Sequence, residues 1–288
     1  MSFTKNSRFI GIIYIICAGF FFSIMSFMVR LSGDLPVMEK AFFRNSVAAI
    51  FSIVILARSE EKFKIKKGSI PGLLIRSAFG TAGLILNFMA IDKIGLADAN
   101  ILNKLSPFFA IIVSIFVLKE KANLIEWICV ILAFTGAAFV IRPSADITSL
   151  YGFFGMLGGL GAGVAYAFVR KLGKQGERGP VIVMCFSIFS CLVTLPFLIL
   201  QFKPMSIIQL LCLLGAGLAA TGGQMFITMA YTKAPASEIS VFDYTQILFA
   251  AMIGFFFLGE IPDLMSVIGY AIIIGVAIFK WAYQMRKK

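Results

Sequence analysis

Three polar residues and a proline lie at helical spacing in a run that is otherwise almost entirely apolar. Asn100, Asn103, Lys104 and Pro107 occupy positions i, i+3, i+4 and i+7, so a helix would gather them on one face. A lysine within an apolar helix in a membrane costs about 2.5 to 3.5 kcal/mol and usually faces water or a partner. Amide and ammonium groups on such a face can bind a polar molecule or pair with a carboxylate.

A carboxylate that could pair with Lys104 occurs at Asp243, in "VFDYTQILF". A shift of 140 positions, the separation of Glu120 and Glu260, aligns Asn103 with Asp243. We hypothesise that Lys104 and Asp243 face one central cavity and are paired, or nearly so, in one conformation. The alternatives are a purely structural ion pair between helices and a lysine that snorkels along lipid.

Other polar residues inside apolar runs are candidates for the same cavity. Each neutral one is more often a hydrogen bond between packed helices, but together they mark the helices that would enclose a polar space. Arg44 suits substrate contact, a structural pairing or anchoring at the outer interface. Arg76 is closer to its helix end and is expected to snorkel to the cytoplasmic face. The candidate binding residues are Lys104, Asp243, Asn103, Asn100, Arg44, Asn87, Tyr166, Gln224, Tyr244 and Gln246.

Pro107 is the candidate hinge. A proline in the middle of a helix lacks the N–H that would bond to the carbonyl four residues earlier. A carbonyl near residue 103 is therefore freed, and we expect the helix to kink beside the cavity.

Composition identifies the environment of these residues. The chain has 288 residues, of which 60% are hydrophobic and 14% charged, with mean hydropathy +0.96. This indicates an integral membrane protein. The net charge of +12 comes largely from short loops, so it is an orientation signal and not a nucleic-acid site. The absence of histidine and the scattered cysteines argue against metal sites, cofactors and membrane enzymes.

Apolar runs of about 20 residues predict ten membrane-spanning helices. With the N-terminus in the cytoplasm, about 17 lysines and arginines fall in the inner loops and termini and about four outside. Both termini are therefore predicted to be cytoplasmic, in a multi-pass protein of the inner membrane. The predicted spans are 9–29, 37–57, 70–91, 97–118, 124–141, 151–170, 180–200, 206–231, 237–258 and 264–283.

The two halves of the chain repeat each other. "TAGLILNFMAIDK" aligns with "TGGQMFITMAYTK", and "FAIIVSIFVLKEKANLIEWI" with "FAAMIGFFFLGEIPDLMSVI", without a gap. The repeats are 1–145 and 146–288. Because each contains an odd number of spans, the second enters the membrane upside down, which is typical of secondary transporters.

The fifth and tenth spans, 124–141 and 264–283, have few polar residues at their centres. We expect them at the periphery of the bundle, around a cavity formed by the other eight. Small residues let membrane helices approach closely, so these two spans are candidates for a homodimer surface. The small residues concerned are Ala133, Gly136, Ala137, Gly269 and Gly275.

The segments "AFFR", "LSPFFAIIVSIFVLKEK" and "ILFAAMIGFFFLGEIPD", within two five-helix repeats, resemble the EamA-type families of the drug/metabolite transporter superfamily. The resemblance implies an all-α membrane fold with helices one to four and six to nine around a central pathway. It implies a structural, helix-end role for Glu120 and Glu260. Similar branches carry amino acids, S-adenosylmethionine or riboflavin.

Together, the residues and the resemblance predict a transporter of a small organic metabolite that works by alternating access. Energy coupling would be proton exchange through Asp243, or there is none. A channel or a lipid flippase is the alternative, and a membrane-embedded enzyme a weaker one. The expected partners are a small-molecule substrate and the lipid bilayer, without nucleic acid and without a cofactor.

Overall fold

The computed structural model describes residues 5–106, 108–109, 112–113, 124–141, 147–233 and 240–286, and within these ranges it contains helices and no strand. The N-terminal part comprises α1 (Lys5–Leu31), α2 (Val37–Ala57), α3 (Ile70–Ile94), α4 (Leu96–Asn103) and α6 (Leu124–Ile141). The C-terminal part comprises α7 (Ile147–Lys174), α8 (Gly179–Gln201), α9 (Ile207–Lys233), the 3-10 helix η1 (Ser240–Tyr244), α11 (Thr245–Ile253), the π-helix η2 (Gly254–Leu258) and α12 (Leu264–Arg286).

Seven of these helices are long and apolar enough to cross a membrane: α1, α2, α3, α7, α8, α9 and α12. The predicted fifth and ninth spans correspond to the shorter apolar stretches Trp127–Ile141 and Phe242–Leu258. The predicted fourth span begins with α4, and most of its second half lies outside the described residues. The chain is therefore a multi-pass membrane protein, built of helices in the segments described above and without strands there.

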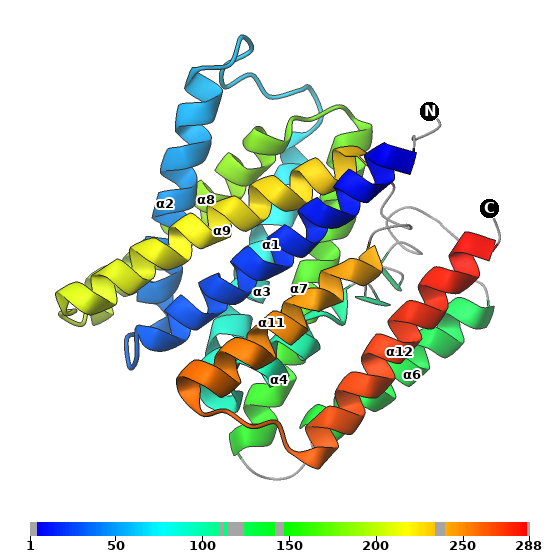
Figure 1. Cartoon of the computed structure of the whole chain (residues 1–288). Helices are drawn as coiled ribbons and strands as arrows, with labels where there is room; N and C mark the ends of the chain where they lie inside the picture. Colours follow the sequence, from blue (N-terminus) through cyan, green and yellow to red (C-terminus); the bar gives the residue numbers. More distant parts are fainter. Residues whose placement is uncertain are drawn as a thin grey trace.

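Helices distant in sequence lie side by side in pairs (Figure 1). α1 packs along α9, α2 along α8, α3 along α7, and α6 along α12. The short α4 lies inside the bundle against α3, α7 and α11. The beginning of α1 and the end of α12 lie at the same end of the bundle (Figure 1).

The α6–α12 pair lies to one side of the other helices, as expected for the fifth and tenth spans (Figure 1). Its outer face is apolar and exposed, for example at Ile131 and Phe279. An exposed apolar surface on a membrane helix faces lipid.

Most of the small residues that suggested a dimer surface are used within the chain. Ala133 and Ala137 are fully buried, and a Cβ on Gly136 or Gly269 would collide with the other helix of the α6–α12 pair. Only Gly275 has open space beside it. These small residues therefore serve the contact between α6 and α12. A homodimer through these helices stays a prediction.

Glycines bring the backbones of α3 and α7 into contact beside the bundle centre. A Cβ on Gly161 would lie 2.8 Å from both the Gly83 Cα and the Phe79 carbonyl oxygen. Because these are backbone atoms, a side chain there could be accommodated only by separating the two helices. The close approach sets the position of α7 relative to α3.

We therefore expect Gly161→Ala to destabilise the folded protein by about 1–3 kcal/mol, the usual cost of overpacking. Gly275→Ala is the matched control, because Gly275 is also inside a helix but nothing lies within 4 Å of its added Cβ. That control should be neutral or slightly stabilising. Thermal unfolding in detergent measures both, and equal midpoints for the two variants would contradict the proposed contact.

Candidate functional site

A cavity of about 110 Å³ lies at the centre of the bundle, between both halves of the chain. Eight of the ten predicted binding residues line it, and Asp243 and Tyr244 lie beside it. Arg76 and small or apolar residues of α1, α3, α7 and α8 complete the wall. The lining residues are Phe22, Met25, Arg44, Arg76, Gly80, Gly83, Leu84, Asn87, Asn100, Asn103, Lys104, Ala162, Ala165, Tyr166, Phe186, Gln224 and Gln246.

Lys104 and Asp243 form an ion pair, with 2.5 Å between Nζ and Oδ2. Both side chains are largely buried, at 8% and 14% exposure. The second oxygen of Asp243 is buried and has no hydrogen-bond partner among the described residues. The alignment of the two halves thus correctly predicted that Lys104 and Asp243 are close together at the cavity wall.

Regular helix is interrupted on both sides of this ion pair. α4 ends at Asn103, and the Leu105 N–H bonds to the Leu102 carbonyl in a tighter turn. On the other side, the 3-10 helix η1 ends at Tyr244, where α11 begins. These interruptions fall at positions that the repeat alignment makes equivalent. Pro107, the candidate hinge, lies outside the described residues.

The break in α4 exposes backbone carbonyls, and neighbouring elements meet them. The Tyr244 hydroxyl donates to the Lys104 carbonyl at 2.9 Å. α7 passes so close that a Cβ on Gly159 would lie 2.7 Å from the Leu102 carbonyl oxygen. Tyr244 therefore holds the broken helix in place, and its contact with substrate stays a prediction.

The amides of Asn100 and Gln246 connect the two halves of the chain. Gln246 Nε2 donates to Asn100 Oδ1 at 2.8 Å, and Asn100 Nδ2 donates to the Leu96 carbonyl at 2.7 Å. The backbone carbonyl of Gln246 accepts a hydrogen bond from the Ser23 hydroxyl on α1. These two amides line the cavity, but their groups are mostly engaged in joining α1, α4 and α11.

Arg76 does not snorkel to the cytoplasmic surface, so that prediction is wrong. The residue is 6% exposed, and its guanidinium lies over the ring of Phe186, 3.9 Å from the centroid. Arg44 is 3% exposed and lies 5.8 Å from the same ring. A long side chain near a helix end can reach either the surface or the interior, and here the aromatic ring of α8 favours the interior.

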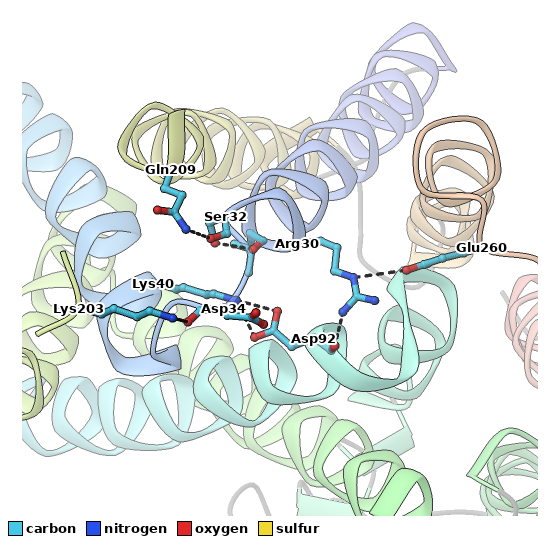
Figure 2. Close-up of polar contacts among 9 residues, drawn as sticks. Arg30, Ser32, Asp34, Lys40, Asp92, Lys203, Gln209 and Glu260 are labelled. Carbon is cyan, nitrogen blue, oxygen red and sulfur yellow. Dashed lines mark hydrogen bonds and ion pairs between the residues drawn. The ribbon is translucent and has the colours of Figure 1, made fainter. Parts of the chain in front are cut away.

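A second polar network joins helices at the end of the bundle opposite the start of α1 (Figure 2). Lys40 has a fully buried side chain and donates to both Asp92 oxygens at 2.8 and 2.6 Å. Arg30 donates to the Asp92 carbonyl and pairs with Glu260, with 3.5 Å between Nε and Oε1. This network joins α1, α2, α3 and the segment after η2.

Two further contacts extend the network to the connection between α8 and α9. Lys203 Nζ donates to the Asp34 carbonyl at 2.9 Å, and Gln209 donates to the Ser32 carbonyl at 3.0 Å (Figure 2). In the sequence, the only signal for this network is the set of polar residues that flank a short loop, and the sequence does not identify their partners.

Glu260 has the helix-end role that the family resemblance implied. Its Oε2 accepts the Leu96 N–H at 2.9 Å, which caps the first turn of α4. Gly95, with φ +89°, leaves the room that this carboxylate occupies, since a Cβ there would lie 2.9 Å from Oε2. A carboxylate at a helix N-terminus is stabilised by the free N–H groups and the helix dipole. Glu120 lies outside the described residues.

Comparison with known proteins gives the same family throughout. The chain is 30% identical over 268 residues to a pseudopaline exporter of Pseudomonas aeruginosa, covering 92% of this chain and 93% of that protein. It is 24% identical to a riboflavin transporter of Vibrio cholerae, covering 98% and 96%. It is 26% identical to the human solute carrier family 35 member G1, covering 96% and 81%.

One solved crystal structure has the same fold, with a TM-score of 0.66 at 13% identity over 96% of this chain and 98% of that one. The profile of the EamA-like transporter family matches twice, at residues 9–142 and 152–280. These two matches cover most of the sequence, and the relatives with named activities are transporters and not enzymes. The chain therefore belongs to the EamA-like transporter family.

Proposed function

We propose that this chain is a secondary transporter that moves a small organic metabolite across the cytoplasmic membrane by alternating access, with the central cavity as its binding site. The observation that carries the proposal is the cavity itself, because charged and amide groups from both halves converge there at two interrupted helices. Broken helices around a site between two repeats are the usual construction of such transporters.

Two inverted five-helix repeats, 1–145 and 146–288, are part of the proposal. The two family matches fall within these halves. If the first five spans exchanged places with the last five, the α1–α9 contact would become the α3–α7 contact. The α2–α8 and α6–α12 contacts would stay unchanged. The four observed helix pairs fit this exchange. In this scheme α4 belongs to the fourth span and η1, α11 and η2 form the ninth, which makes ten crossings.

The proposal takes both termini to be cytoplasmic, as the positive-inside distribution predicts. The network of Arg30, Lys40, Asp92 and Glu260 then lies at the external end (Figure 2). In this conformation it joins helices of both halves and closes the external end. Alternating access requires these contacts to separate when the cavity opens outward.

Lys104 and Asp243 give the cavity a means of responding to substrate or protons. The pair is buried, so removal of either partner would leave an uncompensated charge. Protonation of Asp243 would release Lys104 toward the cavity, which is the proposed route for proton coupling. The substrate expected from the sequence is an amino acid, S-adenosylmethionine or a similar metabolite.

A thermal-shift screen of the purified protein against amino acids, S-adenosylmethionine, nucleosides, riboflavin and quaternary amines identifies a compound that binds the folded state. Uptake of that compound into proteoliposomes then tests transport. We expect Lys104→Met and Asp243→Asn each to lower uptake at least ten-fold, because each leaves a buried charge without its partner.

The double variant Lys104→Met/Asp243→Asn distinguishes a functional pair from a structural one. It removes both charges and should fold about as well as the native protein, but it should stay inactive. Recovery of native uptake in the double variant, or full uptake in both single variants, would exclude the pair from the transport mechanism.

The external network is tested by a reversible cross-link. In a background without the native cysteines, Arg30→Cys/Glu260→Cys joined by a short thiol-reactive linker should lose at least nine-tenths of its uptake, and reduction should restore it. Glu260→Cys alone, treated in the same way, is the control for modification. Undiminished uptake by the cross-linked protein shows that the external end does not need to open there.

A further inference from the structure

The central cavity contains two arginines whose charges are not balanced by any acidic residue described on its wall. Neither Arg44 nor Arg76 forms a salt bridge with a described residue, and the cavity lining contains no aspartate or glutamate. Lys104 is neutralised by Asp243. The wall thus carries a net charge of about +2, in a place where an unpaired charge is costly.

Several of the arginine hydrogen-bond donors are also unused. Nε of Arg44, and Nε and Nη1 of Arg76, are buried and have no partner among the described residues. Both residues are more than nine-tenths buried. Buried donors in folded proteins are normally satisfied, so these point to a ligand that supplies acceptor oxygens.

The surroundings hold both guanidinium groups in place without using those donors. Phe186 lies beneath Arg76 and beside Arg44, at 3.9 and 5.8 Å from ring centroid to Cζ. A guanidinium stacked on a ring keeps its in-plane N–H groups free for a planar acceptor. Gly80 leaves room for this stack, since a Cβ there would lie 3.1 Å from the Phe186 ring and 3.2 Å from Arg76 Nη1.

Arg44 is fixed from its other side by a chain of hydrogen bonds. Its Nη1 donates to Asn45 Oδ1 at 2.6 Å, and Asn45 Nδ2 donates to Ser190 on α8 at 2.8 Å. Arg44 is therefore positioned by α2 and α8 while its Nε stays unused. The two arginines come from α2 and α3, and both lie close to the Phe186 ring of α8.

We propose that Arg44 and Arg76 form the anion-binding subsite of the cavity and that the substrate is a small, net-negative molecule bound through carboxylate groups. A carboxylate matches the fork of a guanidinium in geometry and charge. Asn87 and Tyr166 stand on the same wall and offer polar groups to the rest of the molecule. The subsite selects organic acids over S-adenosylmethionine and quaternary amines, whose positive charge the arginines would repel.

This inference rests on the proposed transport function, so its test measures binding and not flux. Purified protein in detergent is titrated with succinate, glutarate, citrate and L-glutamate, and separately with succinamide and glutaramide, which keep the size but lack the charge. We expect at least one acid to raise the unfolding temperature in a saturable way, and the diamides and tetramethylammonium to have no such effect. Absence of a shift with all four acids, or an equal shift with the diamides, overturns the proposal.

Inorganic phosphate distinguishes a carboxylate site from a general anion site. We expect half-saturation by phosphate at ten-fold or higher concentration than by the best acid. Equal or tighter binding of phosphate overturns the assignment to carboxylates.

Variants then locate the binding. Arg44→Gln and Arg76→Gln should each weaken the stabilisation by the acid at least ten-fold, whereas Arg58→Gln, an exposed arginine outside the cavity, should not. The ligand-free Arg76→Gln protein should unfold at the native temperature or above it, because an uncompensated buried charge has been removed. A lower unfolding temperature with undiminished acid binding would assign Arg76 a structural role and overturn the proposal.

The two proposals can fail separately. Acid binding that depends on both arginines, in a protein that does not move the same acid into proteoliposomes, would reject transport and keep the subsite. Uptake of a neutral or cationic compound that is unaffected by Arg44→Gln and Arg76→Gln would keep transport and reject the subsite.

Discussion

A charge buried among apolar helices needs a partner, and this constraint explains most of the polar architecture of the protein. Lys40 lies fully buried against Asp92 at one end of the bundle, and Lys104 lies against Asp243 at the cavity wall. Each pair joins helices that are far apart in sequence, so it also fixes how those helices pack. The exceptions are Arg44 and Arg76, which line the cavity and carry buried donors without a partner among the described residues.

The backbone follows the same rule as the side chains. Where α4 ends at Asn103, its last carbonyls leave the regular helical pattern. The Leu102 carbonyl accepts the Leu105 N–H in a tighter turn, and the Lys104 carbonyl needs a donor that a membrane cannot supply as water. Tyr244 supplies a hydroxyl to one of these carbonyls, and Gly159 lets α7 approach the others. Glu260 does the equivalent at the beginning of α4, where it accepts the Leu96 N–H. The interrupted helix is therefore held at both ends by residues from the second half of the chain, which keeps the cavity wall in position.

Two sequence signals located the cavity wall: polar residues inside apolar runs, such as Arg44 and Asn87, and the alignment of the two halves of the chain. The alignment of Asn103 with Asp243 predicted that Lys104 would have a carboxylate nearby, although Lys104 and Asp243 are far apart in sequence. The Lys40–Asp92 pair could not be found in this way, because the two residues come from different helices of one half and no internal alignment relates them. Arg76 was misassigned because depth along a helix does not determine the direction of a long side chain. Its direction depends on Phe186, which only the packing of α3 against α8 brings within reach.

The proposed inverted repeats carry unequal charges, and this asymmetry affects the proposed cycle. Repeats of similar shape allow two conformations of similar energy, opened to opposite sides. The cavity residues break this balance, because closing the bundle around an empty site would bury two uncompensated guanidinium groups, whereas closing it around an anion would bury a neutralised complex. The presence of an anion in the cavity would then determine how easily the carrier changes conformation. The unpaired arginines lower the stability of the empty protein, and they would thereby couple the conformational change to substrate binding.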